Sequence, residues 1–491
     1  MTNKEERKAL SLDIETKKME ATTKWLNEIK LIKPEVDSSF ILNLFVELNE
    51  AFKTIDENNA ITTDPYSFLI GLVANIDAQI SAQMDAIIHN PVFQKLEASW
   101  RGLQKLVFNT ETGTHLKLRL LPITKKELYN DLMRAVEFDQ SALFKKVYED
   151  EYGTLGGTPY SCLVGDFAFG RSKYDIELLR AISTLAAASH APFIGGVNPN
   201  MFDIESFADL GVPRDLASIF ESSELAAWNS FRQTEDSRYV SLVLPTVLMR
   251  SPYDPEENPC ESFNYEEDVE GTNNSLFCWG NPAYDLALKI TTAYAEFSWT
   301  TAIRGEEGGG KVESLPTFTY ETDGGDVELK CPCQVSITDR REKELSNLGF
   351  ISLCHSKGND HAVFFSGQTS QKAKRYNTPD ASANAVISTR LPYLLNASRF
   401  AHYIKMLMRA KIGSFLTAAE VQVYLQNWIA QYVLLSDMGT QEVKSRYPLR
   451  LAKITVVDSP DDPGSYKAII LLKPHFQLEE LAVSLRLVAK L

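Results

Sequence analysis

The sequence lacks the apolar segments that carry a chain into or across a membrane. Its N-terminus, MTNKEERKALSLDIE, is charged and contains no hydrophobic core of the kind found in secretory signals. The longest apolar stretches, such as Tyr239–Met249, are interrupted by Ser and Pro and fall well short of a membrane span of about 20 residues. We therefore expect a cytoplasmic protein that does not insert into a membrane.

Cysteine and histidine are also scarce, with six and seven residues in a chain of 491. Without an export signal, reduced thiols are favoured over disulfides. Cys331 and Cys333, with Cys354 and His355, could suggest zinc, but one residue separates the first two thiols where zinc sites usually have two. His355 follows a potential nucleophile, yet adjacency in sequence does not create a catalytic dyad. His190 follows an Ala-rich helix and is interpreted as a packed or capping residue. We predict no metal, no cofactor and no catalytic site.

An excess of basic charge is absent as well. The chain has 50 Lys and Arg against 65 Asp and Glu, a net charge of -15. Such a chain is a poor candidate for wrapping nucleic acid or binding an anionic membrane without a local basic patch. One run of acidic residues could resemble a cation site or an acid/base site. We interpret it instead as a solvated loop, or as an acidic face that binds a basic partner. Its members are Glu266, Glu267, Asp268 and Glu270.

One basic group stands out against this background. It lies on or near a helix predicted around residues 400–408, and two interpretations stay open. It is a solvated helix face, or it makes an electrostatic contact with an acidic surface of another protein. The group consists of Arg399, Lys405, Arg409 and Lys411.

The length suggests two to four domains, and 44% hydrophobic residues suffice for a sizeable core. The first hundred residues are predicted to be helical, because apolar residues recur there at helical spacing. One stripe is formed by Ile41, Leu44, Phe45, Leu48 and Phe52. A second is formed by Leu69, Leu72, Val73, Ile76, Ile80 and Met84. Residues 1–35 are more charged and resemble an arm that needs a partner to become ordered.

Strands and helices alternate in the middle of the chain. Alternating polarity at His115–Leu121 predicts a half-buried strand, and Thr124 with Glu127 predicts a helix N-terminus. A strand, helix and strand are predicted at Tyr160–Val164, Asp175–Ser189 and Phe193–Val197, which favours a buried parallel unit. Further predicted elements are helices at Asp215–Phe220, Glu224–Arg232 and Pro282–Phe297, a strand at Tyr239–Leu244, a hairpin of Thr317–Tyr320 with Val327–Lys330, and a short helix from Asp339 that Gly349 closes.

A domain boundary is predicted near Thr378 and Pro379, after a polar stretch. Beyond it the pattern predicts a long helix around Phe400–Met408, a second helix capped by Thr417 and Glu420, and two strands, Leu451–Val457 and Tyr466–Leu472. The last residues alternate again, with one apolar face made by Val483, Leu485, Leu487, Ala489 and Leu491. Such a strand either closes its own sheet or completes a neighbour's sheet by β-augmentation.

The segment Gly305–Lys311 satisfies the spacing of a phosphate-binding loop, G-x-x-x-x-G-K. Three features weigh against nucleotide binding. Val312 replaces the Ser or Thr that would hold magnesium, two glutamates inside the loop would repel phosphate, and Pro316 disfavours the helix that should follow. A P-loop-like nucleotide-binding protein is therefore the alternative hypothesis, and a flexible loop at a subunit contact is preferred.

Long phrases of the sequence resemble the large subunits of type VI secretion contractile sheaths (the VipB/TssC/ImpC-like family). They cover most of the chain from about residue 90 onwards. They include LEASWRGL from Leu96, YGTLGGTPYSCLVGDF from Tyr152, HAPFIGGVNPNMF from His190, ESFNYEEDVEGTNNS from Glu261, AIRGEEGGGKVESLPT from Ala302, SRFAHYIKMLMRAKIGSF from Ser398 and PHFQLEELAVSLRLVAKL from Pro474. The region before residue 60 departs from the family pattern.

The resemblance implies a structural protein with a mixed α/β sheath fold, and no enzyme. Its expected parts are an N-terminal arm and helix (1–60), a central sheath body (61–375) and a C-terminal inner-layer domain (376–491) completed by strand exchange between protomers. Its expected partners are a small sheath subunit, copies of itself, a hexameric inner-tube protein, a baseplate and an AAA+ recycling unfoldase, all assembled in the bacterial cytoplasm.

The resemblance also assigns roles to residues. Strand exchange is expected at Val483, Leu485, Arg486, Leu487 and Leu491. Packing with the small subunit is expected at Ile41, Leu44, Phe45, Leu48 and Phe52. Separately from the resemblance, the basic charge of Arg399, Lys405, Arg409 and Lys411 predicts a contact with the inner tube or a lateral contact. The glycine loop Gly305–Gly310 carries no nucleotide role in the family.

Overall fold

The structure, a computed structural model, describes residues 65–475 and 477, except 257, 261, 262, 264, 323, 415, 416, 437 and 459–465. The chain divides into two compact units. The first contains the residues up to Ile87 and Tyr253–Glu267, and the second contains Ile88–Pro252 and Asp268 onwards. No helix among the described residues is long and apolar enough to cross a membrane. The predicted arm at 1–60 and the predicted final strand lie outside the described residues.

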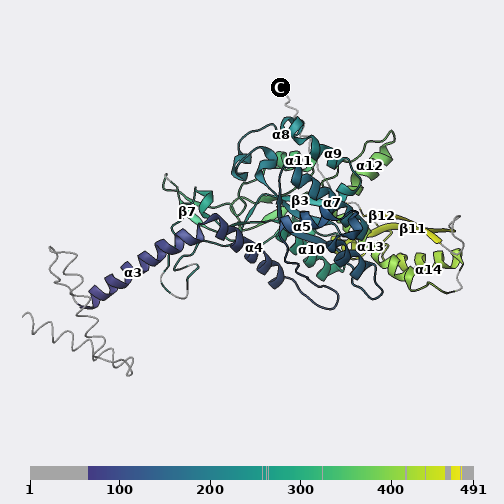
Figure 1. The fold of residues 1–491 in the computed structure, drawn as a ribbon, viewed down its shortest axis with the longest axis horizontal. Coiled ribbons are helices and arrows are strands. Elements are labelled where there is room, and N and C mark those ends of the chain that lie inside the picture. The colour runs from purple at the N-terminus through teal and green to yellow at the C-terminus, as the bar shows by residue number, and fades with distance from the viewer. Residues whose placement is uncertain are drawn as a thin grey trace, which may run out of the picture. The chain divides into compact units, whose positions relative to one another are not determined.

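The described part of the first unit is built on α3, Pro65–Ile88 (Figure 1). This helix confirms the helix predicted over Leu69–Met84, and Pro occupies its first position, where a missing N–H costs little. The loop of the same unit is held to the helix, because the Tyr265 hydroxyl donates to the Asp85 carboxylate over 2.6 Å. Glu267, from the predicted acidic run, is buried and accepts a hydrogen bond from the Tyr253 N–H over 2.9 Å. That carboxylate therefore shapes the loop itself.

A six-stranded sheet in the order β1-β2-β3-β9-β10-β6 forms the centre of the second unit (Figure 1). Its strands are β1 Leu163–Phe169, β2 Phe193–Val197, β3 Val240–Leu244, β6 Lys311–Val312, β9 Ile351–His355 and β10 Ala362–Phe364. The first four in this order are parallel, and β10 runs antiparallel to both of its neighbours, β9 and β6. The predicted parallel unit is confirmed, with α7, Lys173–Ser189, between β1 and β2, but its first strand was predicted too early, at Tyr160–Val164.

Hydrophobic cores lie on both faces of this sheet. Successive residues of β2 take part in different clusters, Phe193 in one and Ile194 in the other. The first cluster includes α7 and the fully buried Trp228, whose ring stacks on Phe350 with centroids 5.3 Å apart. The second cluster includes α10, Ala283–Phe297. The strands are therefore buried on both sides, as the parallel pattern predicts.

The remaining elements of the body flank the sheet. The helices are α4 Pro91–Phe108, α5 Lys125–Arg134, α6 Ala142–Phe144, α8 Leu216–Phe220, α9 Ala226–Arg232, α11 Asp339–Asn347 and α12 Pro379–Ser388. Small antiparallel pairs are β4 Val247–Leu248 with β5 Trp279–Gly280, and β7 Thr319–Glu321 with β8 Val327–Leu329. The capping box of α5 and the hairpin β7–β8 confirm two local predictions.

One predicted strand is wrong. Residues 115–121 form no strand, although Leu116 and Leu118 are more buried than Lys117. Arg119 is held by the side chains of Glu151, Thr158 and Tyr160, so side-chain contacts fix the segment instead of a backbone ladder. Alternation alone does not distinguish a strand from an extended segment that has no partner strand.

The C-terminal region is a hairpin packed on helices (Figure 1). Its elements are α13 Leu391–Arg409, α14 Ala418–Ala430, α15 Gln441–Arg446, β11 Leu449–Asp458 and β12 Tyr466–Pro474. The predicted long helix, the Thr417 and Glu420 capping box and both strands are confirmed. Phe400 stacks on Trp299 with ring centroids 4.4 Å apart, in a core shared with Leu425 and Ile454. The mixed α/β fold is thus confirmed, whereas the domain limits at 60 and 375 stay predictions.

Candidate assembly surfaces

The hairpin β11–β12 is a two-stranded sheet, so each strand has an edge without a partner strand among the described residues. The strands pair in register from Leu451 opposite Lys473 to Asp458 opposite Tyr466. A two-stranded hairpin is marginal on its own. Packing on α14 stabilises its inner face, where Ile454 and Val456 are buried. Sheet edges of this kind are where a strand of another chain can add.

The two edges of the hairpin differ, because glutamines of α14 cap the β11 edge. The Gln426 side chain accepts from the Ile454 N–H over 2.9 Å and donates to the Ala452 carbonyl over 3.0 Å. Gln422 accepts from the Val456 N–H over 3.0 Å. No hydrogen bond of this kind to β12 is found among the described residues. The sequence gives no local signal for this pairing, since the partners lie 26 to 34 residues apart.

The outer face of the hairpin mixes aliphatic and basic side chains. We call it the outer hairpin face: Leu451, Lys453, Thr455, Val457, Lys467, Ile469, Leu471 and Lys473. Its four aliphatic side chains are between 40% and 58% exposed. The sequence analysis predicted both strands and did not single out this face.

Helix α3 carries a long exposed apolar stripe. Its members Ile70, Val73, Ile76, Ile80 and Ile87 are 39% to 55% exposed. Their spacings of three, four and seven residues place them along one side of the helix, as in a helix that packs against another element. The predicted stripe from Ile41 to Phe52 lies outside the described residues.

Helix α4 has two different faces. Ala98, Gly102 and Leu106 are buried, and Gly102 lets the helix approach α10 closely, because a Cβ there would lie 2.4 Å from the Tyr284 ring. The other face leaves apolar side chains in solvent, namely Phe93, Leu96, Trp100 and Val107. Sequence reasoning missed this surface, although the helical spacing of these four residues contains it. It is a second candidate surface for a partner chain.

The predicted basic group is half-buried in the structure, and each member contacts the same chain. Arg399 lies over the Tyr403 ring and Lys411 over the Tyr424 ring, both 4.6 Å from the centroid. Lys405 lies 3.3 Å from the Tyr152 centroid, and Arg409 donates to the Gly153 carbonyl over 2.8 Å. The contacts of Lys405 and Arg409 hold α13 against the segment before β1. The prediction that these residues touch another protein stays a prediction.

A buried histidine, His402, lies on α13 near these contacts. The His402 Nε2 atom is 2.9 Å from the Ser189 carbonyl oxygen, so the neutral ring donates there. Burial, together with the positive charges of Arg399 and Lys405, lowers the pKa of His402 from 6.5 to about 4. His190, predicted to be a packed or capping residue, ends α7 in the left-handed conformation, with its Nδ1 atom 3.3 Å from the Tyr239 hydroxyl. That prediction is confirmed.

We predict that acidification destabilises this junction. Between the unfolded pKa of 6.5 and the folded value of about 4, the unfolded chain binds more protons at His402, so stability falls as pH drops through that window. The loss is about 3 kcal/mol at most. Urea unfolding at several pH values measures it, and H402Q, which keeps a donor for the Ser189 carbonyl, should flatten the profile. An unchanged profile in H402Q would contradict the assignment.

The glycine loop has a different geometry from a phosphate-binding loop. Residues Glu306–Gly310 coil tightly, and the edge strand β6 follows where a phosphate-binding loop is followed by a helix. The Lys311 ammonium lies 2.9 Å from the carboxylate of Glu313, which directly follows β6. The local arrangement therefore does not support the alternative nucleotide-binding hypothesis.

The cysteines behave as core residues. Cys333 and Cys354 are buried, and burial raises the pKa of the Cys354 thiol to about 12 and that of Cys333 well above its usual value. A metal or a nucleophilic site needs the thiolate, which this environment disfavours. Within the described residues, no three His, Cys, Asp or Glu side chains converge as metal ligands would.

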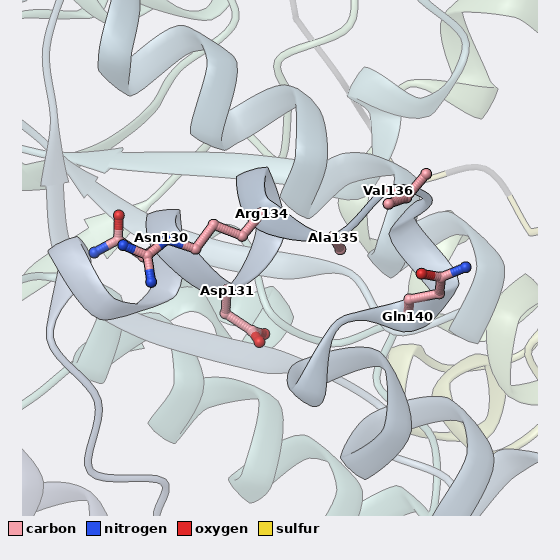
Figure 2. Close-up of a pocket in the computed structure, with 6 residues that line it drawn as sticks. All are labelled: Asn130, Asp131, Arg134, Ala135, Val136 and Gln140. Atoms are coloured by element: carbon pink, nitrogen blue, oxygen red, sulfur yellow. The ribbon is translucent and has the colours of Figure 1, made fainter.

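Figure 2 shows an open hollow beside α5, which sequence reasoning did not anticipate. It has a volume of about 440 Å³ and is lined by Asn130, Asp131, Arg134, Ala135, Val136 and Gln140. The Asp131 carboxylate already accepts hydrogen bonds from the N–H groups of Ala142 and Leu143, at 2.9 and 3.0 Å. The Asp131 carboxylate therefore stabilises the local fold through these two hydrogen bonds.

Comparison with known proteins identifies the family, which the local geometry does not. Residues 71–371 match the family model of the EvpB/VC_A0108 tail sheath N-terminal domain, and residues 380–491 match that of the EvpB/VC_A0108 tail sheath gpW/gp25-like domain. The type VI secretion system sheath protein TssC1 of Pseudomonas aeruginosa is 44% identical over 440 residues, which cover 89% of this chain and 88% of that protein.

Two solved structures have a weaker likeness. A chain from the baseplate of the anti-feeding prophage is 13% identical, with a TM-score of 0.35 over 64% of this chain and 66% of that chain. A chain from the contracted helical sheath of the same particle is 13% identical, with a TM-score of 0.31 over 62% and 66%.

Proposed function

The chain belongs to the type VI secretion tail sheath family as a large sheath subunit, a structural protein, and on this premise we propose that it pairs with a small sheath subunit and polymerises into a contractile tubule. The tubule surrounds an inner tube of hexameric rings in the bacterial cytoplasm and drives that tube outward on contraction. Assembly begins at a baseplate, and an AAA+ unfoldase recycles the contracted polymer, mainly through the small subunit.

The observation that carries this proposal is the open hairpin β11–β12. Its β12 edge has backbone groups without a strand partner among the described residues, and the last segment of the chain alternates like a strand. Addition of a neighbour's segment around Val483–Leu491 to such a sheet would satisfy these groups and tether neighbouring protomers. Tethered protomers can then rotate as rigid bodies between an extended and a contracted lattice.

The apolar stripe of α3 supports a helical partner. Five exposed aliphatic side chains on one side of a 24-residue helix favour helix packing with the small subunit. The N-terminal residues Ile41, Leu44, Phe45, Leu48 and Phe52 extend this surface in our proposal. Each of these five side chains is 39% or more exposed.

Charge placed in this stripe should separate the two subunits. In I76D/I80D, two buried carboxylates would oppose packing with the partner helix, and we expect loss of co-purification with the small subunit. A78D/A82D is the matched control, because these exposed alanines lie on the opposite side of α3 and carry the same charge change. Affinity pull-down of co-expressed subunits measures the effect. Equal recovery in both variants would remove α3 from the interface.

A further inference from the structure

The chain leaves the hairpin at a defined point after β12. Pro474, the last residue of β12, lies opposite Leu449 at the open end of the hairpin. The next residue, His475, is buried, and its N–H donates to the Pro448 carbonyl over 3.3 Å. The backbone is therefore still attached to the hairpin at His475, and the tail of the chain begins beyond it.

Gln477 attaches the beginning of this tail to the body. Its backbone N–H donates to the Tyr393 hydroxyl over 3.0 Å, and its side-chain Nε2 donates to the Thr301 carbonyl over 2.9 Å. Tyr393 and Thr301 are both buried. A backbone group and a side-chain group of one residue thus bind two separate segments, which fixes the position and the orientation of Gln477. We call Gln477, Tyr393 and Thr301 the tail anchor.

The tail anchor lies where the hairpin core meets a core of the body. Trp299, two residues before Thr301, belongs with Phe400 to the hairpin core. Ile303, two residues after Thr301, belongs with Leu391 to a core of the body. Helix α13, which carries Tyr393, crosses the same junction, because it contains both Phe400 and Leu391. Both segments that hold Gln477 are therefore fixed by buried side chains.

The anchor limits how far the predicted final strand can reach. That strand begins at Val483, six residues after Gln477, so it must begin within about 20 Å of the anchor. If Gln477 were released, the tail would be free from His475 onwards, and its reach to Val483 would grow to about 27 Å. The volume open to the start of the strand would rise about twofold, and the effective concentration of the strand at a neighbouring hairpin would fall in proportion.

We propose that the tail anchor positions the strand that one protomer gives to the open hairpin of its neighbour. Gln477 is a positioning residue, since it holds the origin of the tail on the body and takes no part in the strand pairing itself. Motion of the body then passes to the neighbour through the short segment between Gln477 and Val483. The inference rests on the proposed function, because it names the residue that directs the strand exchanged between copies of this chain.

Variants of similar side-chain size test the anchor in the full chain co-expressed with its small subunit. Y393F removes the hydroxyl that accepts from the Gln477 N–H, and Q477M removes the donor to the Thr301 carbonyl while keeping a side chain of similar length. In Y393F/Q477M we expect the protein concentration at which tubules form to rise at least about twofold. Sedimentation of tubules over a dilution series measures it, and recovery of the heterodimer should stay unchanged.

A matched control loses the same two kinds of hydrogen bond elsewhere in the body. In Y129F/Q94M, the hydroxyl lost is the donor to the Glu177 carboxylate, and the amide lost is the donor to the Ser275 carbonyl. This control should assemble like the wild type. The heterodimers of the two double variants should unfold at similar temperatures, because each loses one hydroxyl bond and one amide bond.

Amide hydrogen exchange reports on the anchor itself. In the wild-type heterodimer the Gln477 amide should exchange slowly, and Y393F should speed its exchange several-fold. The amide of Ile470, within β12, should exchange at the same rate in both proteins, since its strand pairing does not involve Tyr393. A Gln477 amide that exchanges equally fast with and without the Tyr393 hydroxyl would contradict the anchor.

The remaining outcomes separate the anchor from the sheath function. Assembly of Y393F/Q477M at the wild-type concentration, or equally impaired assembly of Y129F/Q94M, would overturn the inference. So would loss of the Y393F/Q477M heterodimer, because the residues would then serve only the fold of their own chain. Failure of the wild-type pair to form tubules, or normal tubules after deletion of Leu485–Leu491, would instead overturn the proposed function.

Discussion

Deletion of Leu485–Leu491 should abolish long tubules while leaving the heterodimer with the small subunit intact. The deletion removes most of the alternating apolar face at the end of the chain, which we propose pairs with the open hairpin of a neighbour. It leaves α3 and the body unchanged, so subunit pairing should persist. Size-exclusion chromatography measures the heterodimer, and negative-stain electron microscopy measures tubules.

Point variants separate strand pairing from simple truncation. L485K/L487K places charge on the apolar face of the segment and should reproduce the deletion, whereas S484K/K490A changes the other face and should assemble. Normal tubules from the deletion would eliminate strand exchange from the account. Loss of the heterodimer together with the tubules would show that the segment serves the fold of its own chain instead.

Removing one partner of the buried ion pair between α4 and α10 should lower the free energy of unfolding more than the other changes that we predict. The Lys105 ammonium lies 2.5 Å from the Asp285 carboxylate, and the Asp285 side chain is fully buried. D285A would leave the Lys105 charge without its partner at the helix interface. We expect a loss of about 3–5 kcal/mol in the free energy of unfolding, measured by urea titration.

Two further variants identify the cause. E296A removes an exposed acid from the same helix and should change stability by less than about 0.5 kcal/mol. K105M/D285L replaces the pair by apolar side chains and should recover most of the loss, since the expensive state is a buried charge without its partner. A D285A protein as stable as E296A would show that water reaches this site in the folded chain.

The elements that the sequence predicts well are those with a local physical signature. Helix α3 follows from apolar spacing, and the capping boxes at Thr124 and Thr417 follow from two residues each. Strand β2 was predicted with its observed bounds, because a short apolar run between a helix end and Asn198-Pro199 has few alternatives.

Sequence reasoning failed where structure depends on distant residues. Strand β6 has two residues and exists because β10, some fifty positions later, pairs with it. The glutamine caps on β11 depend on the packing of α14 against the hairpin, which no local pattern records. Conversely, the segment at 115–121 has the alternation of a strand and no partner strand among the described residues.

The candidate surfaces divide in the same way. The outer hairpin face and the exposed face of α4 were present in the residue pattern, but which side of each element is covered depends on the tertiary structure. The group from Arg399 to Lys411 illustrates the reverse. Its basic charge suggested an exposed surface, while the aromatic rings of Tyr152, Tyr403 and Tyr424 approach three of its four side chains within the chain.

The most direct test of the account is co-expression of the chain with its small sheath subunit, followed by negative-stain electron microscopy of the purified material. We predict long hollow tubules that contain both chains. A well-behaved monomer that does not bind the small subunit would contradict the proposed sheath function. It would also contradict the roles that we propose for the hairpin, the final strand and α3.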